Sequence, residues 1–447
     1  MVDELFPSRW TWVKLEDIQA PNTRAIVSGP FGSNIGSRFF VSDGVPVIRG
    51  NNLTKDMTRF IDNGFVFVTE EKARELSGCV ALPGDLVFTA AGSLGQVGLI
   101  PWSAKYPKYI ISNKQMRVRL NRQVVDELFA FYWFSSPLMV KYIDQRNTGS
   151  SVPLINLSIL RNLPLPLPPL AEQRSIACIL GTLDDKIELN RQMNKTLEAI
   201  TKAIYKSWFV DFDPVRARMD DRKAYGMNAE TASLFPNSFD VSPLGKIPKG
   251  WKIGTIGDIA DNPRRGVTPN DINQNTPYIG LEHMPRKSIA LEEWGLAQEV
   301  SSNKFSFYEG EILFGKLRPY FHKVGVAVLD GVCSTDILVI VPKYSEWFGF
   351  VLSHVTSDEF VQYTDGTSTG TKMPRTNWSD MKAYKIILPH KNIIEHFNKI
   401  VQGMVEAIRD NILQSHTLIS IRDALLPKLL SGEIRIKDAE KYAETVL

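Results

Sequence analysis

The 447-residue sequence has few cysteines and no long hydrophobic run. Its three cysteines, Cys79, Cys178 and Cys333, are too far apart to indicate a disulfide framework or a thiolate zinc site. A reducing cytoplasm is therefore the expected environment. The most apolar stretches, such as 337–341, are far shorter than the roughly 20 residues of a membrane-spanning helix. The opening MVDELFPSRW lacks the basic and apolar pattern of a secretory signal, so we expect neither insertion nor secretion.

The sequence also lacks the motifs of several enzyme classes. It contains no GxxxxGK(S/T) string, which excludes a P-loop ATPase. Its 6 histidines are scattered, without HExxH or a Cys/His cluster, and the GSLGQVG string does not have the spacing of a dinucleotide loop. Asp184, Asp185 and Lys186 fall within a predicted helix, where charges of both signs are typical of a solvated face rather than of a nuclease site. We therefore expect a non-catalytic protein with no metal or cofactor of its own.

The overall composition is that of an ordinary globular protein. Hydrophobic residues make up 43% and charged residues 23%, and the formal net charge is +3. The length predicts about three domain-sized units, or two with long appendages. The near-neutral balance excludes a histone-like polycation. Any contact with nucleic acid must therefore come from local clusters of positive charge.

Two copies of one plan make up the sequence. WVKLEDI is matched by WKIGTIGDI, and PGDLVFTAAGSLGQVGLI by EGEILFGKLRPYFHKVGVA. SSVPLINLSILRNLPLPLP is matched by TKMPRTNWSDMKAYKIILP, where Pro153 corresponds to Pro374. Short β-branched and aromatic runs such as FVFVT, DLVF, QMRVRL and DILVIVP predict strands, and a helix is expected near 125–144 and again near 344–364. Each copy is therefore expected to be a largely β domain.

Each copy ends in a helix with heptad periodicity. Seam positions step by four and three residues from Ile176 to Trp208 in the first copy and from Phe397 to Leu429 in the second. Both seams become polar at the same place, where a buried pair such as Asn190 and Asn411 can fix register and orientation. Each helix could instead pack only on its own domain. A helix of about 60 Å overhangs a domain of about 150 residues, however, so its length favours pairing within the chain. Asp211 to Gly250, between the copies, is expected to be a partly ordered connector.

Positive charge is concentrated in two stretches without acidic residues, 86–125 and 312–329. Aromatic residues are interleaved with the positive charges in both. Such local positive fields suit the neutralisation of phosphates, although solvated strand faces over a core would give the same pattern. The candidate phosphate-binding residues are Lys105, Lys108, Lys114, Arg117, Arg119 and Arg122 in the first stretch, and Lys316, Arg318 and Lys323 in the second.

Side chains that can read base edges are present in predicted loops. Arginine, asparagine and glutamine form bidentate hydrogen bonds with bases, although single residues of these types in loops also commonly cap turns. The candidates are Arg49, Asn51 and Asn52 in VIRGNNLT, Asn113 and Gln115 in SNKQ, and Arg264 and Arg265 in NPRRG.

The ordered strings WVKLEDI, SGPFGSN, PVIRGNNL, PGDLVFTAAGSLGQVG, PLPPLAEQRSIA, LDDKIELN, WFVDFDP, IPKGWKIGTIGDI and LLPKLLSGEI together resemble the specificity subunit of type I restriction-modification systems. The resemblance implies an α+β fold, with two similar, mostly β target-recognition domains and two long helices that form an antiparallel intramolecular coiled coil. The implied boundaries are 1–168 and 249–390 for the domains, 169–210 and 391–432 for the helices, 211–248 for the connector and 433–447 for a C-terminal tail.

The resemblance also implies a function. Each domain would read one half of a bipartite double-stranded DNA sequence, and the differing loops imply two different half-sites. The helices would dock two methyltransferase subunits, and restriction subunits would bind outside them. S-adenosylmethionine, ATP and Mg would belong to those partners. The second helix reads NIIEHFNKI where the first reads PLAEQRSIA, so unequal affinities for the two methyltransferase subunits are expected. Two alternatives remain, a protein-protein scaffold without DNA readout and a stand-alone DNA-modifying enzyme.

Overall fold

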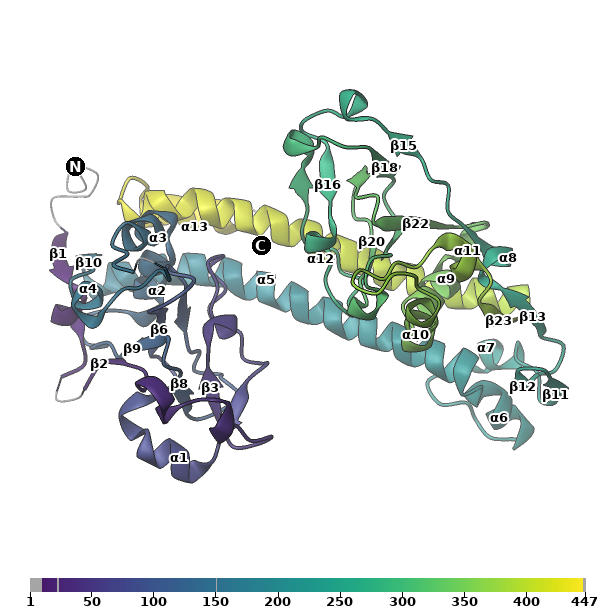
Figure 1. The fold of residues 1–447 in the computed structure, drawn as a ribbon, viewed down its shortest axis with the longest axis horizontal. Coiled ribbons are helices and arrows are strands. Elements are labelled where there is room, and N and C mark those ends of the chain that lie inside the picture. Colours follow the sequence, from purple (N-terminus) through teal and green to yellow (C-terminus); the bar gives the residue numbers. More distant parts are fainter. Residues whose placement is uncertain (1–9, 22–23, 150, 445–447) are drawn as a thin grey trace. The chain divides into compact units, whose positions relative to one another are not determined.

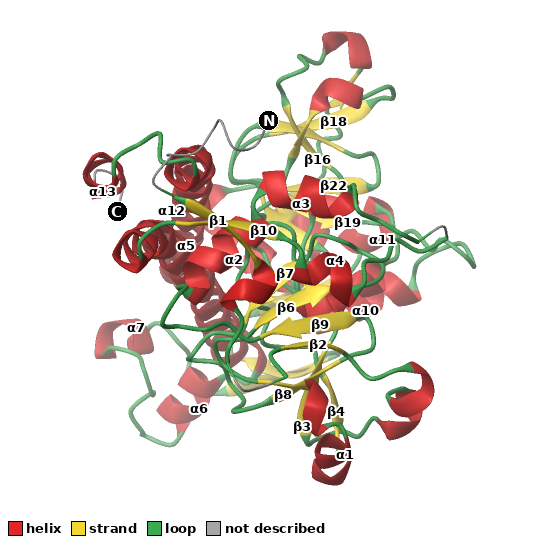
Figure 2. Ribbon diagram, turned by 90° about the vertical axis from the view of Figure 1, so that its left-hand side faces the viewer, coloured by secondary structure: helices red, strands yellow, loops and turns green. Residues whose placement is uncertain are grey.

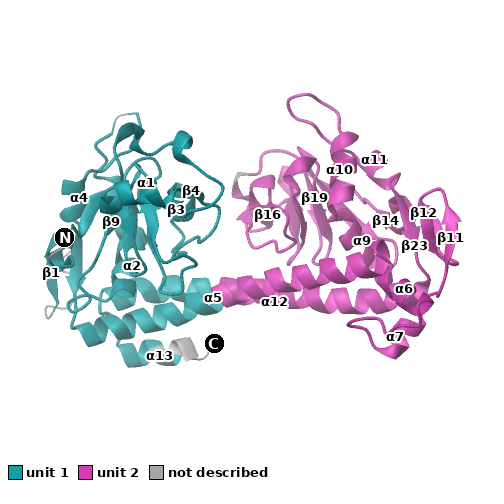
Figure 3. Cartoon of the chain, turned by 90° about the horizontal axis from the view of Figure 1, so that it is seen from below, with its two compact units in different colours: residues 1–187, 417–447 teal, residues 188–416 magenta. Residues whose placement is uncertain are grey.

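Two compact units make up the computed structural model, which describes residues 10–21, 24–149 and 151–444. Unit 1 comprises residues 1–187 and 417–447, and unit 2 comprises residues 188–416 (Figure 3). Each unit contains one copy of the sequence repeat and part of each long helix. Both units combine short-stranded sheets with helices, which confirms the predicted α+β class.

Unit 1 contains two four-stranded sheets (Figure 2). One has the order β2 (Ile26–Ser28), β9 (Gln115–Val118), β6 (Leu86–Thr89), β7 (Val97–Leu99), and the other the order β4 (Val66–Val68), β3 (Val45–Ile48), β8 (Tyr109–Ile111), β5 (Val80–Ala81). Strands β3 and β8 are parallel, and the remaining pairs are antiparallel. A separate antiparallel pair, β1 (Thr11–Lys14) with β10 (Pro164–Leu167), joins the start of the domain to the segment before the long helix.

The helix expected near 125–144 is two helices. The helices of this unit outside the long pair are α1 (Glu70–Glu75), α2 (Glu127–Ser135), α3 (Pro137–Asp144), α4 (Leu157–Arg161) and α13 (Ile436–Glu444). The break between α2 and α3 is at Ser136, whose hydroxyl accepts the Met139 N–H at 3.3 Å as an N-cap. Pro137 follows at the first helical position, where its missing N–H costs nothing.

Unit 2 repeats this topology and adds one strand, β15, to the edge of its second sheet. Its two sheets have the orders β14 (Ala260–Asp261), β22 (Ile337–Pro342), β19 (Ile312–Gly315), β20 (Val324–Val326) and β17 (Gly295–Leu296), β16 (Pro277–Ile279), β21 (Gly331–Cys333), β18 (Lys304–Phe307), β15 (Gly266–Val267). The parallel pair β16 and β21 corresponds to β3 and β8. Strands β13 (Lys252–Thr255) and β23 (Lys385–Leu388) pair as β1 and β10 do. The repeat inferred from the sequence is therefore present in the fold.

The second expected helix, near 344–364, is also divided. The short helices of this domain are α8 (Ile256–Ile259), α9 (Phe348–Val355), α10 (Asp358–Gly366) and α11 (Trp378–Lys382). Ser357 caps α10 by accepting the Phe360 N–H at 3.2 Å, at the place where Ser136 caps α3 in unit 1.

The connector between the copies is more ordered than its composition suggested. It forms α6 (Asp213–Met219), α7 (Ala229–Ser233) and an antiparallel hairpin of β11 (Phe239–Ser242) and β12 (Gly245–Pro248). Phe212 and Phe235 are buried against Trp208 and Trp251 in the core of unit 2. These aromatic side chains bury enough apolar surface to hold the segment in place.

The two long helices, α5 (Leu170–Tyr205) and α12 (Lys391–Leu430), lie side by side within each unit (Figure 1). A π-helical turn, Lys206–Val210, follows α5. In unit 1 Asp184 of α5 contacts Arg422 of α12, and in unit 2 Thr201 of α5 contacts Met404 of α12. Rising numbers in one helix meet falling numbers in the other, so the predicted antiparallel pairing is confirmed. Among the described residues, none of the helices is both long and apolar enough to cross a membrane.

Candidate nucleic-acid interface

A cleft of about 440 Å³ opens between four segments of unit 1. Its lining brings together Arg49, Asn113, Lys114 and Gln115, four of the residues singled out in the sequence. The other lining residues are Ile35, Gly36, Phe40, Gly50, Thr89, Ala91, Gly92, Ser93, Gln96 and Ser112. The cleft therefore combines hydrogen-bonding side chains with a lysine, as contacts to bases and phosphates require.

A glycine holds one wall of this cleft against another. The Gly29 N–H donates to the Gln115 carbonyl at 2.9 Å, and a Cβ at Gly29 would lie 1.8 Å from the Ser112 oxygen. Only glycine allows this approach, so the loop that follows it packs on the turn carrying Asn113 and Lys114, both of which are exposed. Phe31 is on this loop with 82% of its surface exposed. Phe31 is not among the candidates predicted from the sequence, which are all polar or charged. An aromatic residue flanked by glycines, as in SGPFGSN, nevertheless suggests an exposed loop position.

The prediction that Asn52 contacts bases is wrong, because its side chain is fully buried. Its amide nitrogen donates to the carbonyls of Ile61 at 3.0 Å and Asn63 at 2.9 Å, and its amide oxygen accepts the Arg49 N–H at 3.0 Å. Asn52 therefore holds the loop that carries Arg49 and Asn51. Asn51 is exposed and donates to the Gly64 carbonyl at 3.3 Å, and Arg49 is half-buried at the cleft.

Gln96 completes this arrangement and was not identified from the sequence. Its amide nitrogen donates to the Leu53 carbonyl at 2.8 Å and the Gly50 carbonyl at 3.2 Å, and its oxygen accepts the Thr89 hydroxyl at 2.9 Å. From the sequence, the spacing of the GSLGQVG string excludes a dinucleotide loop but does not indicate a role for Gln96. A glutamine at the start of a strand can tie neighbouring loops together.

Gln115 and Arg117 are also buried in β9. Gln115 borders the cleft but is only 1% exposed, and its amide oxygen accepts the Ser112 hydroxyl. Arg117 is 5% exposed and donates to the carbonyls of Val80 and Arg24. Burial lowers the pKa of the Arg117 guanidinium. The prediction that Arg117 neutralises a phosphate is therefore wrong, since the buried side chain links β9 to β5 of the other sheet and to the segment before β2.

Acidic residues from outside the first acid-free stretch pair with several of its positive charges. Lys108 pairs with Glu70 at 2.6 Å, and both side chains are exposed, so its contact with a phosphate stays a prediction. Arg119 and Arg122 pair likewise with Asp85 and Glu127. Lys105 and Lys114 remain exposed, and no ion pair to either is present in the described part of the chain. The absence of acidic residues from this stretch of sequence therefore predicted a larger positive surface than the structure has.

In unit 2 the NPRRG segment divides its two arginines. Arg265 forms a two-point ion pair with Glu311, at 2.8 and 2.6 Å, and these hydrogen bonds raise the pKa of the guanidinium. Its contact with bases stays a prediction, because the side chain is 28% exposed beside this ion pair. Arg264 is exposed and has a left-handed backbone, with φ of 47°. Such strained positions concentrate at functional sites, so Arg264 remains a candidate.

The second acid-free stretch also contains one internal lysine. The Lys323 ammonium donates to the Leu281 carbonyl, and burial lowers its pKa, so it is not a phosphate contact as predicted. Arg318 has a left-handed backbone, with φ of 51°, and donates to the Lys372 carbonyl at 3.3 Å. Lys316 is half-buried at the end of β19. Within the described ranges, no three His, Cys, Asp or Glu side chains gather as a metal site.

The polar positions of the helix pair contact the opposite helix. The fully buried Asn190 lies within hydrogen-bond distance of Asn411, Gln414 and Ser415, with its amide nitrogen 2.9 Å from the Gln414 oxygen. The Asn411 amide donates to the Asn194 oxygen at 2.9 Å. Each contact fits only one alignment of the two helices. The assignment of Asn190 and Asn411 to register control stays a prediction.

The glutamine of the PLAEQRSIA signature is an internal residue. Gln173 is fully buried, and its amide oxygen accepts the Asp126 N–H at 2.9 Å. Its nitrogen donates to the carbonyls of Pro168 at 2.8 Å and Val124 at 3.2 Å. These bonds fasten the start of α5 to the domain that precedes it.

Residues 7–199 match the family model described as the type I restriction modification DNA specificity domain. The chain is similar to the type I restriction enzyme MjaIX specificity subunit of Methanocaldococcus jannaschii, with 26% identity over 97% of this chain and 95% of that one. It is 27% identical to the HindI specificity subunit of Haemophilus influenzae, over 84% of this chain and 94% of that one. A type I S subunit structure from M. genitalium has the same fold, with a TM-score of 0.53, 15% identity, and coverage of 94% of this chain and 96% of that one.

Proposed function

Because this chain belongs to the family of type I restriction-modification specificity subunits, we propose that it reads a bipartite DNA target, one half through each repeated domain. A specificity subunit is the non-catalytic component of such a system. The proposal therefore needs surfaces that recognise DNA rather than a reaction centre.

The cleft of unit 1 supports this proposal most directly. Arg49 comes from one loop, Asn113 and Lys114 come from another, and all three line one opening. In unit 2, Arg264 and Lys316 are on the loops that correspond to the cleft walls, with different side chains throughout. Because bases are read by the particular side chains in a loop, unlike loops on the same framework favour two unlike half-sites.

The paired helices support a scaffold role. We propose that they dock two methyltransferase subunits, that restriction subunits join outside this core, and that the complex acts on DNA in the cytoplasm. S-adenosylmethionine, ATP and Mg would be bound by those partners. Because the Gln173 side chain is buried and hydrogen-bonded within unit 1, a partner would contact the exposed face of α5 rather than this side chain.

Selection from a random duplex library, with and without methyltransferase partners, tests the proposed function. We expect enrichment of a two-part sequence when the partners are present. Binding to partners without enrichment of any sequence would favour a protein-protein scaffold. DNA modification by the isolated chain would favour a stand-alone enzyme.

Replacing Lys114 with alanine is expected to weaken DNA binding by a similar factor on every sequence. The exposed ammonium at the cleft is suited to a phosphate, and its loss should reduce the slope of log affinity against log salt by about 1. Titration of labelled duplexes at several salt concentrations measures this slope. Lys246→Ala, an exposed lysine of β12, is the matched control for net charge, and an equal slope for the two variants would contradict the assignment.

A further inference from the structure

Two loops occupy the same place in the two copies of the repeat. One contains Arg59 and follows the turn Gly50–Asn52, and the other contains Ile289 and follows the turn Leu281–His283. The Leu99 N–H of β7 donates to the Arg59 carbonyl at 2.8 Å, and the Val326 N–H of β20 donates to the Ile289 carbonyl at 3.1 Å. Two residues earlier, each loop has a left-handed residue, Met57 with φ of 64° and Lys287 with φ of 57°. Arg59 and Ile289 are therefore equivalent positions.

In unit 1 a side chain of the loop reaches α5. The Arg59 guanidinium donates to the Asp185 carboxylate at 2.8 Å and to the Gly181 carbonyl at 2.8 Å, and it lies 3.4 Å from the Tyr132 hydroxyl. A Cβ at Gly181 would lie 3.3 Å from the guanidinium and 3.0 Å from Leu128. A glycine in α5 thus leaves room for this charge-assisted contact, which is stronger than a neutral one.

In unit 2 the charge comes from the helix instead. Glu198 of α5 is 7% exposed, and its carboxylate accepts the Ser288 hydroxyl at 2.6 Å and the N–H groups of Ile289 at 3.2 Å and Ala290 at 3.3 Å. The same backbone position is therefore held on the same helix by the opposite charge. A buried carboxylate left without these donors would be costly, so the contact is strongly favoured.

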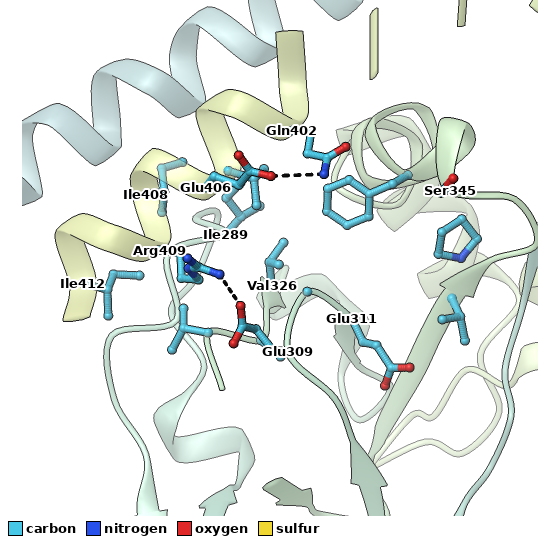
Figure 4. A pocket seen from close by; sticks show the side chains of 17 residues that line it. Ile289, Glu309, Glu311, Val326, Ser345, Gln402, Glu406, Ile408, Arg409 and Ile412 are labelled. Carbon is cyan, nitrogen blue, oxygen red and sulfur yellow. Dashed lines mark hydrogen bonds and ion pairs between the residues drawn. The ribbon is translucent and has the colours of Figure 1, made fainter. Parts of the chain in front are cut away.

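Ile289, the position in unit 2 equivalent to Arg59, cannot make a contact with α5 like that of the Arg59 side chain. Ile289 borders an apolar cavity of about 400 Å³ between α12 and the sheet, with the Arg409–Glu309 ion pair at its edge (Figure 4). Arg59 extends from the equivalent position to the helix, but Ile289 has no polar group to do so. In unit 2 the loop therefore depends on its backbone N–H groups and on Glu198.

Each held loop ends beside the turn that follows the parallel strand, Gly50–Asn52 after β3 in unit 1 and Leu281–His283 after β16 in unit 2; the first of these turns carries the candidate Asn51. In unit 1 Asn52 binds the carbonyls of Ile61 and Asn63 and so fixes the far end of the loop against the turn. In unit 2 Tyr278 and Gly295 pair across β16 and β17, which places the end of the loop next to the turn that begins at Gly280. A shift at either contact with α5 would therefore be transmitted to the adjoining turn.

We propose that Arg59 and Glu198 are positioning residues for DNA recognition, each of which fastens one reading loop to α5. This inference rests on the proposed function and adds which residues set the geometry of each half-site. Neither side chain needs to touch DNA. Loss of either one should therefore relax the selection of bases at one half-site and leave the other half-site unchanged.

The test compares Arg59→Ala and Glu198→Ala in the complex with methyltransferase partners, by selection from a duplex library. We expect each variant to lose about tenfold discrimination at one half-site, a different half-site for each variant, with the other half-site within about twofold of wild type. Arg59→Lys should restore part of the discrimination because it retains the charge. Asp185→Asn removes an exposed partner of Arg59 and should affect the same half-site even if Arg59→Ala folds poorly.

Arg409→Ala is the matched control, since it breaks an ion pair between a long helix and the same domain outside the reading loop. The inference would be overturned if either variant relaxed base selection equally at both half-sites, or left selection unchanged at both. The proposed function would still be upheld in that case, provided that the wild-type complex selects a two-part target. A wild-type complex that selects no two-part target would overturn the proposed function itself.

Discussion

Replacing Arg422 with alanine is expected to lower the free energy of unfolding of unit 1 by about 3–5 kcal/mol. Arg422 of α12 bonds the Asp184 carboxylate of α5 at 2.8 Å, and their side chains are only 7% and 10% exposed. The Tyr132 hydroxyl donates to the same carboxylate at 2.5 Å, which ties the pair to the domain. Removal of the arginine would leave Asp184 buried with its charge uncompensated. Urea denaturation followed by tryptophan fluorescence and circular dichroism measures the effect.

Arg409→Ala provides the comparison on the same helix. Arg409 and Glu309 are 37% and 48% exposed, so loss of their ion pair should cost less than about 1 kcal/mol. The double variant Arg422→Leu, Asp184→Leu should recover much of the lost stability, because an apolar pair carries no desolvation penalty. Similar small losses for Arg422→Ala and Arg409→Ala would show that the buried pair is not important for stability.

Lengthening both long helices by four residues is expected to change the permitted gap between the half-sites without changing the bases that are read. The insertions belong between Ile187 and Glu188 in α5 and between His416 and Thr417 in α12, where the chain passes between the units. Four helical residues add about 6 Å, which corresponds to about one or two base pairs of duplex. Selection from a library with variable spacers measures the preferred gap.

The same four residues inserted at Gly226, in the connector of unit 2, are the control and should leave the gap unaltered. An unchanged gap preference in the helix-lengthened variant would show that the length of the helices does not set the spacing. Altered half-site bases in that variant would indicate instead that the insertion disturbs the domains.

The repeat and the two long helices could be predicted because their signals are local and periodic. The seam from Ile176 to Trp208 follows a spacing that only a helix satisfies, and residues such as Leu180 and Leu183 are fully buried. The breaks at Ser136 and Ser357 were missed, although a serine cap before Pro137 is a recognised start signal. Apolar residues on both sides of each break make the two helices resemble a single helix in the sequence pattern.

The candidate site was less predictable, because the exposure of a polar side chain depends on contacts far away in the sequence. Arg117 donates to a carbonyl 93 positions away, and Arg265 pairs with a carboxylate 46 positions away. Asn52 is a candidate by composition but binds the inside of its own loop. Arg49, Asn113 and Lys114 are predicted from side-chain type and local charge, and the topology brings all three to the cleft; their contacts with DNA stay a prediction.

The strand pairs β1–β10 and β13–β23 have a further consequence. In each copy these pairs hold the first and last strands of a domain side by side, so the chain enters and leaves the domain at one place. The segment between the paired strands is a continuous cassette that also packs on α5 and α12. Genetic recombination in the codons for Thr11–Lys14 and Pro164–Leu167 could exchange one cassette for another while the remainder of the subunit keeps its shape, which gives this architecture a direct route to new sequence preferences.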